Sequence, residues 1–155
     1  MTNKPKAIGT ACETAVVRYL QANGFPHAER RALRGGLDAG DVTGCPGICI
    51  EIKGGEAAKS ASDAQVEAWL IETETERINA NAEIGLLAMQ RKAVGPKNAG
   101  QWWTVIRLDH VLSGDDSIRS SPGWPTIRDI PVRMHLSDAV QLLRAAGYGN
   151  PLGAS

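Results

Sequence analysis

The sequence predicts an α/β fold in which a mixed central β-sheet is flanked by helices. Stretches with the apolar spacing of helices alternate with short runs of β-branched or continuously apolar residues. Their order is one helix, three strands, a second helix and two strands, and this order favours a single sheet covered by helices. With 155 residues, of which 43% are hydrophobic, the chain is long enough to bury a core without disulfides.

The first part of the chain carries one helix and three strands. We expect a helix over 10–22, which ends at an Asn-Gly pair suited to a C-terminal cap. A strand is predicted over 27–33, before a Gly-Gly break, and a hairpin over 40–53 turns at a Pro-Gly pair. Residues 54–61 are mostly small and predict a loop.

A long helix and two strands follow. Ser62 is expected to cap a helix that runs to about Ala80. Nearly continuous apolar runs predict buried strands over 84–90 and 101–108. The helix positions expected to face the sheet are Val66, Trp69, Leu70, Thr73 and Ile78.

The predicted hairpin ends in an acid and a lysine on one face. Asp41 opens the hairpin, and the run Ile50-Glu51-Ile52-Lys53 closes it. Because alternate side chains of a strand point to opposite faces, Glu51 and Lys53 share one face while both isoleucines enter the core. Carboxylate oxygens suit magnesium and a lysine can hold a water, and these are the groups of a centre that hydrolyses phosphodiesters. The alternative is an ordinary solvated Glu-Lys pair at a strand end.

A third candidate acid, Glu13, lies in the first predicted helix. It precedes Val16 and Leu20 by three and seven residues, so it lies on the inward stripe, where unpaired carboxylates are rare. A metal or a basic partner would explain that position. The alternative is a capping box, in which Glu13 bonds only the backbone amide of Thr10.

The helix acid, the basic strand, Gly-Asp-Val and Ile-Glu-Ile-Lys together resemble the PD-(D/E)XK nuclease superfamily, most closely its archaeal-type and phage-type Holliday junction resolvases. The resemblance covers roughly 8–91, a little over half of the chain. It departs from the superfamily name at Gly40, where proline is expected. It implies a restriction-endonuclease-like αβββαβ core.

The resemblance also implies the roles of the site residues. Glu13, Asp41 and Glu51 would be the acids that bind Mg²⁺, with the main-chain carbonyl of Ile52 as a further ligand, and Mn²⁺ would substitute. Lys53 would position the attacking water. The implied activity is that of a magnesium-dependent, structure-selective DNA endonuclease that resolves four-way junctions by paired phosphodiester hydrolysis.

Other functions stay open at this point. A nuclease of the same fold could cut flaps, duplex DNA or a specific site, because the motif concerns the bond and not the shape of the substrate. A different class is a non-catalytic scaffold whose acidic helix around Glu72 binds a protein. A four-way junction has near two-fold symmetry, so we expect a homodimer with two active sites.

Charge is balanced over the whole chain, with 17 basic and 17 acidic residues, whereas DNA-binding domains are usually basic. Bases are concentrated in the first third, so we expect a polarised molecule. The acids Glu67, Glu72, Glu74 and Glu76 of the second helix are interpreted as a solvated face. The residues expected to contact DNA are Arg30, Arg31, Arg34, Lys59, Gln65, Arg91 and Lys92.

The chain is expected to form a nuclease core domain over 1–112 and a C-terminal extension over 113–155 packed on the same domain. The extension is interpreted as a long loop over 113–131 followed by a helix over 137–146. Three roles remain open for the loop: an arm that contacts DNA, a dimer clasp, or a flap over the sheet.

Cysteine usage and hydropathy bear on location. The three cysteines match no zinc pattern and are expected to be buried small residues in a reducing compartment. No apolar run is long enough to span a bilayer, and the first residues lack the apolar core of a signal peptide. We therefore expect a cytoplasmic protein with no membrane partner, located in the host cytoplasm if a phage encodes it.

Overall fold

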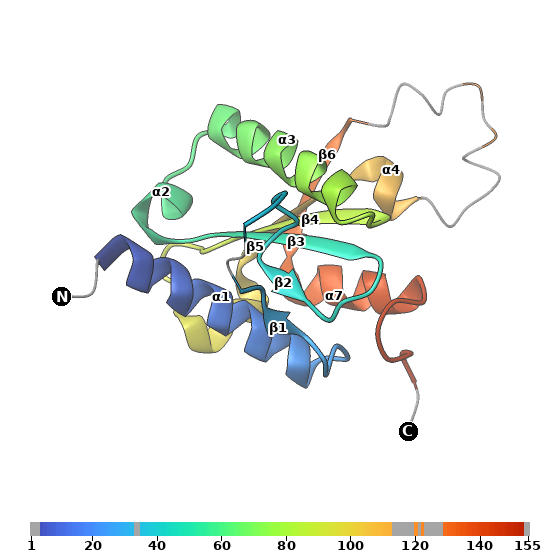
Figure 1. Cartoon of the computed structure of the whole chain (residues 1–155), viewed down its shortest axis with the longest axis horizontal. Coiled ribbons are helices and arrows are strands. Elements are labelled where there is room, and N and C mark those ends of the chain that lie inside the picture. Colours follow the sequence, from blue (N-terminus) through green and yellow to red (C-terminus); the bar gives the residue numbers. More distant parts are fainter. Residues whose placement is uncertain (1–3, 33–34, 113–119, 121, 123–128, 154–155) are drawn as a thin grey trace.

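A four-stranded mixed sheet forms the centre of the computed structural model, with helices on both faces (Figure 1). Its strands, in spatial order, are β3 (Ile48–Lys53), β4 (Ile84–Met89), β5 (Trp103–Arg107) and β6 (Pro131–His135). β3 and β4 are parallel, whereas β4–β5 and β5–β6 are antiparallel. The structure describes residues 4–32, 35–112, 120, 122 and 129–153.

One face of the sheet is covered by α1 (Lys4–Ala22), the short 3-10 helix η1 (Pro96–Gln101) and α7 (Leu136–Ala145). The side chains that fill this layer include Val16, Leu20, Ile50, Trp102, Ile106 and Val140, all buried. Ile48, Ile50 and Ile52 of β3 point into this layer, as the alternation of the strand predicts.

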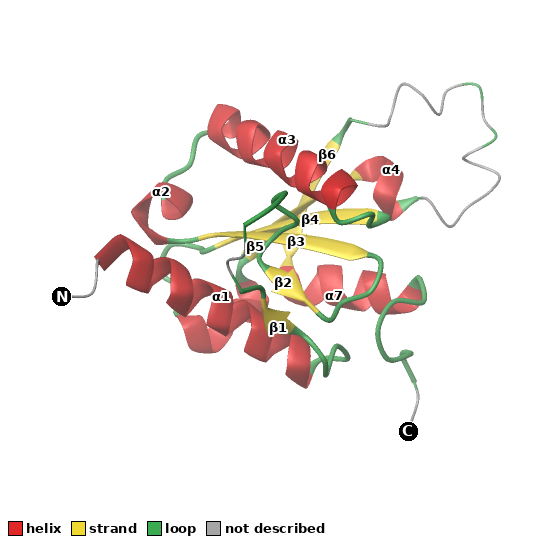
Figure 2. Cartoon of the chain, viewed as in Figure 1, coloured by secondary structure: helices red, strands yellow, loops and turns green. Residues whose placement is uncertain are grey.

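The other face is covered by α3 (Asp63–Asn79), which lies across the sheet opposite α1 and α7 (Figure 2). Val66 and Leu70 pack there against Leu87 and Val105 of the sheet. Glu51 and Lys53 of β3 point to this side, because they alternate with the three isoleucines. The face under α3 is therefore the one that carries the candidate site.

A small antiparallel ribbon lies beside the main sheet. It consists of β1 (Glu29–Arg30) and β2 (Val42–Thr43). Asp41, just before β2, donates its backbone N–H to the Ile50 carbonyl at 2.8 Å and accepts from the Arg31 N–H at 2.8 Å. Asp41 is thereby fixed between the ribbon and the main sheet.

The predicted long helix and buried strands are confirmed. Ser62 caps α3 by accepting a hydrogen bond from the Gln65 N–H, and all six residues of β4 are buried. The C-terminal helix lies one residue before its predicted position. The expected burial of Cys12, Cys45 and Cys49 is also confirmed.

Several local predictions are wrong. The first helix begins at Lys4 rather than at residue 10, so Thr10 lies inside a helix and cannot act as its N-cap. The strand predicted over 27–33 is only two residues long. The small residues of 54–61, predicted as a loop, include a short helix, α2 (Gly55–Lys59). Ile78, predicted to face the sheet, is 64% exposed.

The C-terminal part of the chain contributes more than predicted. β6 is an unpredicted edge strand of the main sheet, and α7 completes the core on the α1 side. A short helix, α4 (Leu108–Val111), follows β5. Most of the loop predicted over 113–131, including residues 113–119 and 123–128, lies outside the described residues. None of the helices in the described ranges has the length and apolar character needed to cross a membrane.

Candidate functional site

The carboxyl groups of Asp41 and Glu51 lie together at the α3 side of β3. Asp41 Oδ2 accepts a hydrogen bond from the Ile52 N–H at 2.7 Å, which holds this carboxyl against the strand. The two side chains are close enough to interact through a hydrogen bond. The structure thus brings together the two acids that are ten residues apart in the sequence.

Gly40 makes this approach possible. Its φ is +88°, in the left-handed region, and a Cβ at this position would lie 2.8 Å from the Ile50 carbonyl oxygen and 2.9 Å from Cys49 Sγ. Proline, which the nuclease resemblance expects here, is fixed near −65° and cannot adopt this backbone. The departure from the superfamily pattern therefore has a structural reason.

Lys53 lies directly beside Glu51. Its Nζ is 2.8 Å from Glu51 Oε1 and 3.5 Å from Glu72 Oε2 of α3. It also lies 5.8 Å from the centre of the Trp69 ring, within range of a cation–π contact. Because Glu51 is only 7% exposed, this is a half-buried site and not the solvated strand-end pair of the alternative interpretation.

A further acid, Glu76 of α3, belongs to the same cluster, which the sequence analysis missed. Glu76 is 5% exposed and its carboxyl interacts with that of Glu51. Its Oε2 is buried and has no hydrogen-bond partner among the described residues. The interpretation of this residue as part of a solvated face was wrong. The available signal was its position three residues after Thr73, which continues the inward stripe.

The acids of this cluster resist ionisation. Burial, followed by the charge of Glu51, raises the pKa of Asp41 to about 7. Burial, followed by the hydrogen bond with Glu76, raises the pKa of Glu51 to about 7. Burial alone would lower the pKa of Lys53, but its hydrogen bond and ion pair with Glu51 raise it. A cation bound between the carboxylates would relieve the unfavourable charge.

Glu13 lies near this cluster but is engaged elsewhere. Its Oε2 accepts from Arg30 Nε at 2.8 Å, across the gap between α1 and β1. Its charge contributes to the raised pKa of Asp41, yet Glu13 makes no hydrogen bond to Asp41 or Glu51. The capping-box alternative does not apply either, because the helix starts well before Thr10.

The two carboxylates of Asp41 and Glu51 are oxygen ligands of the kind that magnesium prefers. Across the described ranges, no group of three or more His, Cys, Asp or Glu side chains is arranged to hold a metal ion. Magnesium in phosphoryl-transfer sites commonly uses one or two carboxylates and completes its shell with water and substrate phosphate. Asp41 and Glu51 provide such a pair, whereas Glu13 would need to leave Arg30 to join it.

No protein-family model, curated protein or solved structure matches this chain. The likeness to PD-(D/E)XK nucleases therefore rests on the four motif residues and on the order of the elements around them.

The residues expected to contact DNA have varied surroundings. Arg31 donates through Nε to the Gly40 carbonyl at 3.0 Å, and so supports the turn before Asp41. Arg34 lies outside the described residues. Gln65 is an exposed residue in the first turn of α3. Lys59 pairs with the exposed Glu56 at 3.1 Å, and Lys92 is exposed.

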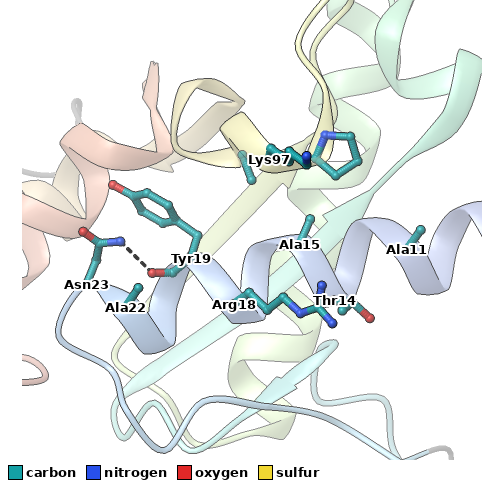
Figure 3. Close-up of a pocket in the computed structure, with 10 residues that line it drawn as sticks. Ala11, Thr14, Ala15, Arg18, Tyr19, Ala22, Asn23 and Lys97 are labelled. Atoms are coloured by element: carbon teal, nitrogen blue, oxygen red, sulfur yellow. Dashed lines mark hydrogen bonds between the residues drawn. The ribbon is translucent and has the colours of Figure 1, made fainter.

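A pocket of about 570 Å³ lies away from the carboxylates, between α1 and η1 (Figure 3). Its lining includes Arg18, Tyr19, Lys97 and several alanines. Asn23 donates to the Tyr19 carbonyl at 2.8 Å at one end. Because it is on the face of the sheet opposite Glu51 and Lys53, we do not assign it to the candidate site.

Proposed function

We propose that this protein is a magnesium-dependent, structure-selective DNA endonuclease with a restriction-endonuclease-like core, and that its substrate is the four-way junction. The observation that carries the proposal is the meeting of Asp41 and Glu51 in one half-buried site, with Lys53 2.8 Å from Glu51. An ordinary surface ion pair would not bring together a buried and a half-buried carboxyl whose pKa values are both raised to about 7.

Each residue of the candidate site has a defined task in this proposal. Asp41 and Glu51, with the Ile52 carbonyl, would hold Mg²⁺, with Mn²⁺ as a substitute, and Glu13, once released from Arg30, would complete the shell directly or through water. Bound magnesium supplies Lewis-acid stabilisation and a lowered pKa for coordinated water. Lys53 orients the attacking water by donating a hydrogen bond to it, and Glu72 and Trp69 hold the lysine side chain in place.

The DNA would meet the molecule at its basic residues. Arg30 lies opposite Val42, the residue after Asp41, and the Arg31 N–H bonds the Asp41 carbonyl, so both would hold phosphates that flank the scissile bond. Each phosphate contact releases counterions, so affinity should fall steeply as salt rises. The cytoplasm is the compartment in which such an enzyme would find DNA.

We further propose a homodimer. Two incisions placed symmetrically across a junction require two active sites, and a two-fold dimer provides them most simply. Sedimentation velocity with and without a synthetic four-way junction tests this. A monomer in both conditions would contradict the dimer without affecting the chemistry at Asp41 and Glu51.

The proposed substrate is tested by comparing three labelled DNAs at matched salt: a four-way junction, a flap and a plain duplex. We expect Mg²⁺-dependent cleavage, suppressed by EDTA, that is fastest on the junction. Faster cleavage of the flap or duplex would retain the nuclease and reject the junction as its substrate.

A second candidate function, a protein-binding scaffold, is favoured by the outer face of α3. Ile71 and Ile78 are 56% and 64% exposed, one heptad apart, with Glu72 beside the first. Exposed isoleucines on a helix are a common feature of protein-binding surfaces. In that case the purified protein would not nick DNA in Mg²⁺ or Mn²⁺, whereas Ile71→Lys would abolish binding to the protein partner.

A further inference from the structure

A second basic feature lies on the α3 side of the sheet, in a pocket of about 300 Å³. Four cations line it: Lys59, Arg91, Lys92 and Arg133. The other lining residues that the structure describes are apolar, aromatic or amide side chains, with no acid among them. In a chain with zero net charge, this concentration of positive charge indicates an anionic ligand.

The arginines of this basic pocket are held by an aromatic platform. The Arg91 guanidinium lies 4.2 Å from the Trp103 ring centre, and that of Arg133 lies 5.8 Å from it. His135 stacks on the same ring at 5.0 Å. Such contacts fix a guanidinium while leaving its N–H groups able to bind phosphate oxygens.

The cations of the pocket are also available. Both hydrogen bonds of Arg91, to the Gln101 carbonyl and to His135, use Nη1, and within the described ranges they leave its Nε and Nη2 for a ligand. Lys92 and Arg133 form no ion pair with any described residue. Among the residues that the structure describes, the partner of Lys59 is Glu56, which is 89% exposed, and such surface pairs are weak.

The register of the sheet relates this pocket to the candidate site. Lys53 lies opposite Met89, Met89 opposite Trp103, and Trp103 opposite His135. The neighbouring row runs from Glu51 through Leu87 and Val105 to Arg133. Three inter-strand spacings separate the ends of each row, about 14 Å. The axial rise of B-DNA is about 3.4 Å per nucleotide and the strand also winds around the axis, so this distance corresponds to about two nucleotides.

We propose that the basic pocket is a phosphate subsite, which holds a DNA phosphate about two nucleotides from the bond that is cut at Glu51 and Lys53. This inference rests on the proposed nuclease function and adds Arg133, with the Trp103 platform, to the residues that bind substrate. The ligand is a phosphate group, either internal to a strand or at its 5′ end.

Binding is measured without cleavage, by fluorescence anisotropy of a labelled four-way junction in EDTA over a series of salt concentrations. The test variant is Lys92→Ala/Arg133→Ala. The matched control is Arg18→Ala/Lys97→Ala, which removes two cations from the opposite side of the sheet. We expect the test variant to bind roughly tenfold more weakly. The fall of log affinity with log salt should become less steep by about 2 in slope, with no change in the control.

The position and source of the phosphate are tested with modified DNA. A neutral methylphosphonate linkage about two nucleotides from the cut should weaken binding to the wild type but not to the test variant. If a 5′-phosphate instead supplies the ligand, removing it should produce the same pattern, and the subsite is retained with a strand end as its ligand.

Two outcomes separate the subsite from the nuclease proposal. A wild type that binds and cuts junctions, with a test variant that has unchanged affinity and salt slope, would overturn the subsite alone. A wild type that binds no DNA would overturn the proposed function and the subsite together.

Discussion

The ammonium of Lys53 lies 2.8 Å from the Glu51 carboxylate, two residues earlier on the same strand, and 3.5 Å from Glu72 on the helix above. The lysine is therefore fixed from two elements, beside the pair of acids expected to hold the metal. This arrangement separates the task of Lys53 from that of Asp41 and Glu51.

Replacement of Lys53 by Met should separate metal binding from catalysis. The variant keeps both acids, so calorimetry should show that Mg²⁺ still binds. Because no ammonium orients the water, single-turnover cleavage should be slower by about 10²-fold or more. Lys97→Met, on the opposite side of the sheet, is the control. Cleavage at the wild-type rate by Lys53→Met would remove the lysine from the mechanism.

The stability of the metal-free protein should decrease as pH rises. Asp41 and Glu51 have pKa values raised from 3.8 and 4.5 to about 7, so the folded state holds their protons more tightly than the unfolded state does. Their contribution to the free energy of unfolding is fully present below about pH 4 and is lost as pH rises through about 7. Mg²⁺ should raise Tm more at pH 8 than at pH 5.5, where protons compete with it. Thermal denaturation at both pH values checks this. A Mg²⁺ effect equal at both would contradict it.

Glu76→Gln should stabilise the metal-free protein at pH 8. The change removes one of three neighbouring acids that repel one another, two of them buried and Asp41 half-buried, and the amide can donate to Glu51. We expect a gain of about 1 kcal/mol, or a few degrees in Tm. Glu67→Gln, at an exposed position of the same helix, should have no effect. A loss of stability in Glu76→Gln would show that the carboxylate is structurally required.

Gly40→Ala should destabilise the protein by about 1–3 kcal/mol, because its backbone has a positive φ and the added Cβ would meet the Ile50 carbonyl. Chemical denaturation measures the change. Gly9→Ala is the matched control, because nothing lies within 4 Å of its Cβ and alanine favours a helix. Equal stabilities of wild type and Gly40→Ala would show that this turn can relax.

Local patterns in the sequence predicted individual strands and their buried faces well. The alternation in 48–53 placed the isoleucines and the Glu51–Lys53 pair on opposite faces, and the apolar run at 84–90 predicted a strand buried on both sides. These features depend on the periodicity of one element, which a sequence shows directly.

Features that depend on partners distant in the sequence were not predictable in the same way. The acid run of α3 looked like a solvated face; the spacing from Thr73 places Glu76 on the inward stripe, but its contact with Glu51 depends on the position of the sheet. Glu13 was expected to join the metal site, but Arg30 lies close enough to pair with it. β6 lacks a strong pattern because it is an edge strand with partly exposed residues.

The most direct test of the central claim is the initial rate of junction cleavage as Mg²⁺ is raised, for wild type, Asp41→Asn, Glu51→Gln and the control Glu67→Gln. If Asp41 and Glu51 hold the ion, the wild type and control will show saturable Mg²⁺-dependent cleavage. The two site variants will lose at least about 10²–10³-fold in rate, while they bind the junction at least as tightly, since a negative charge near phosphate is gone. Cleavage by either site variant at the wild-type rate would contradict the account.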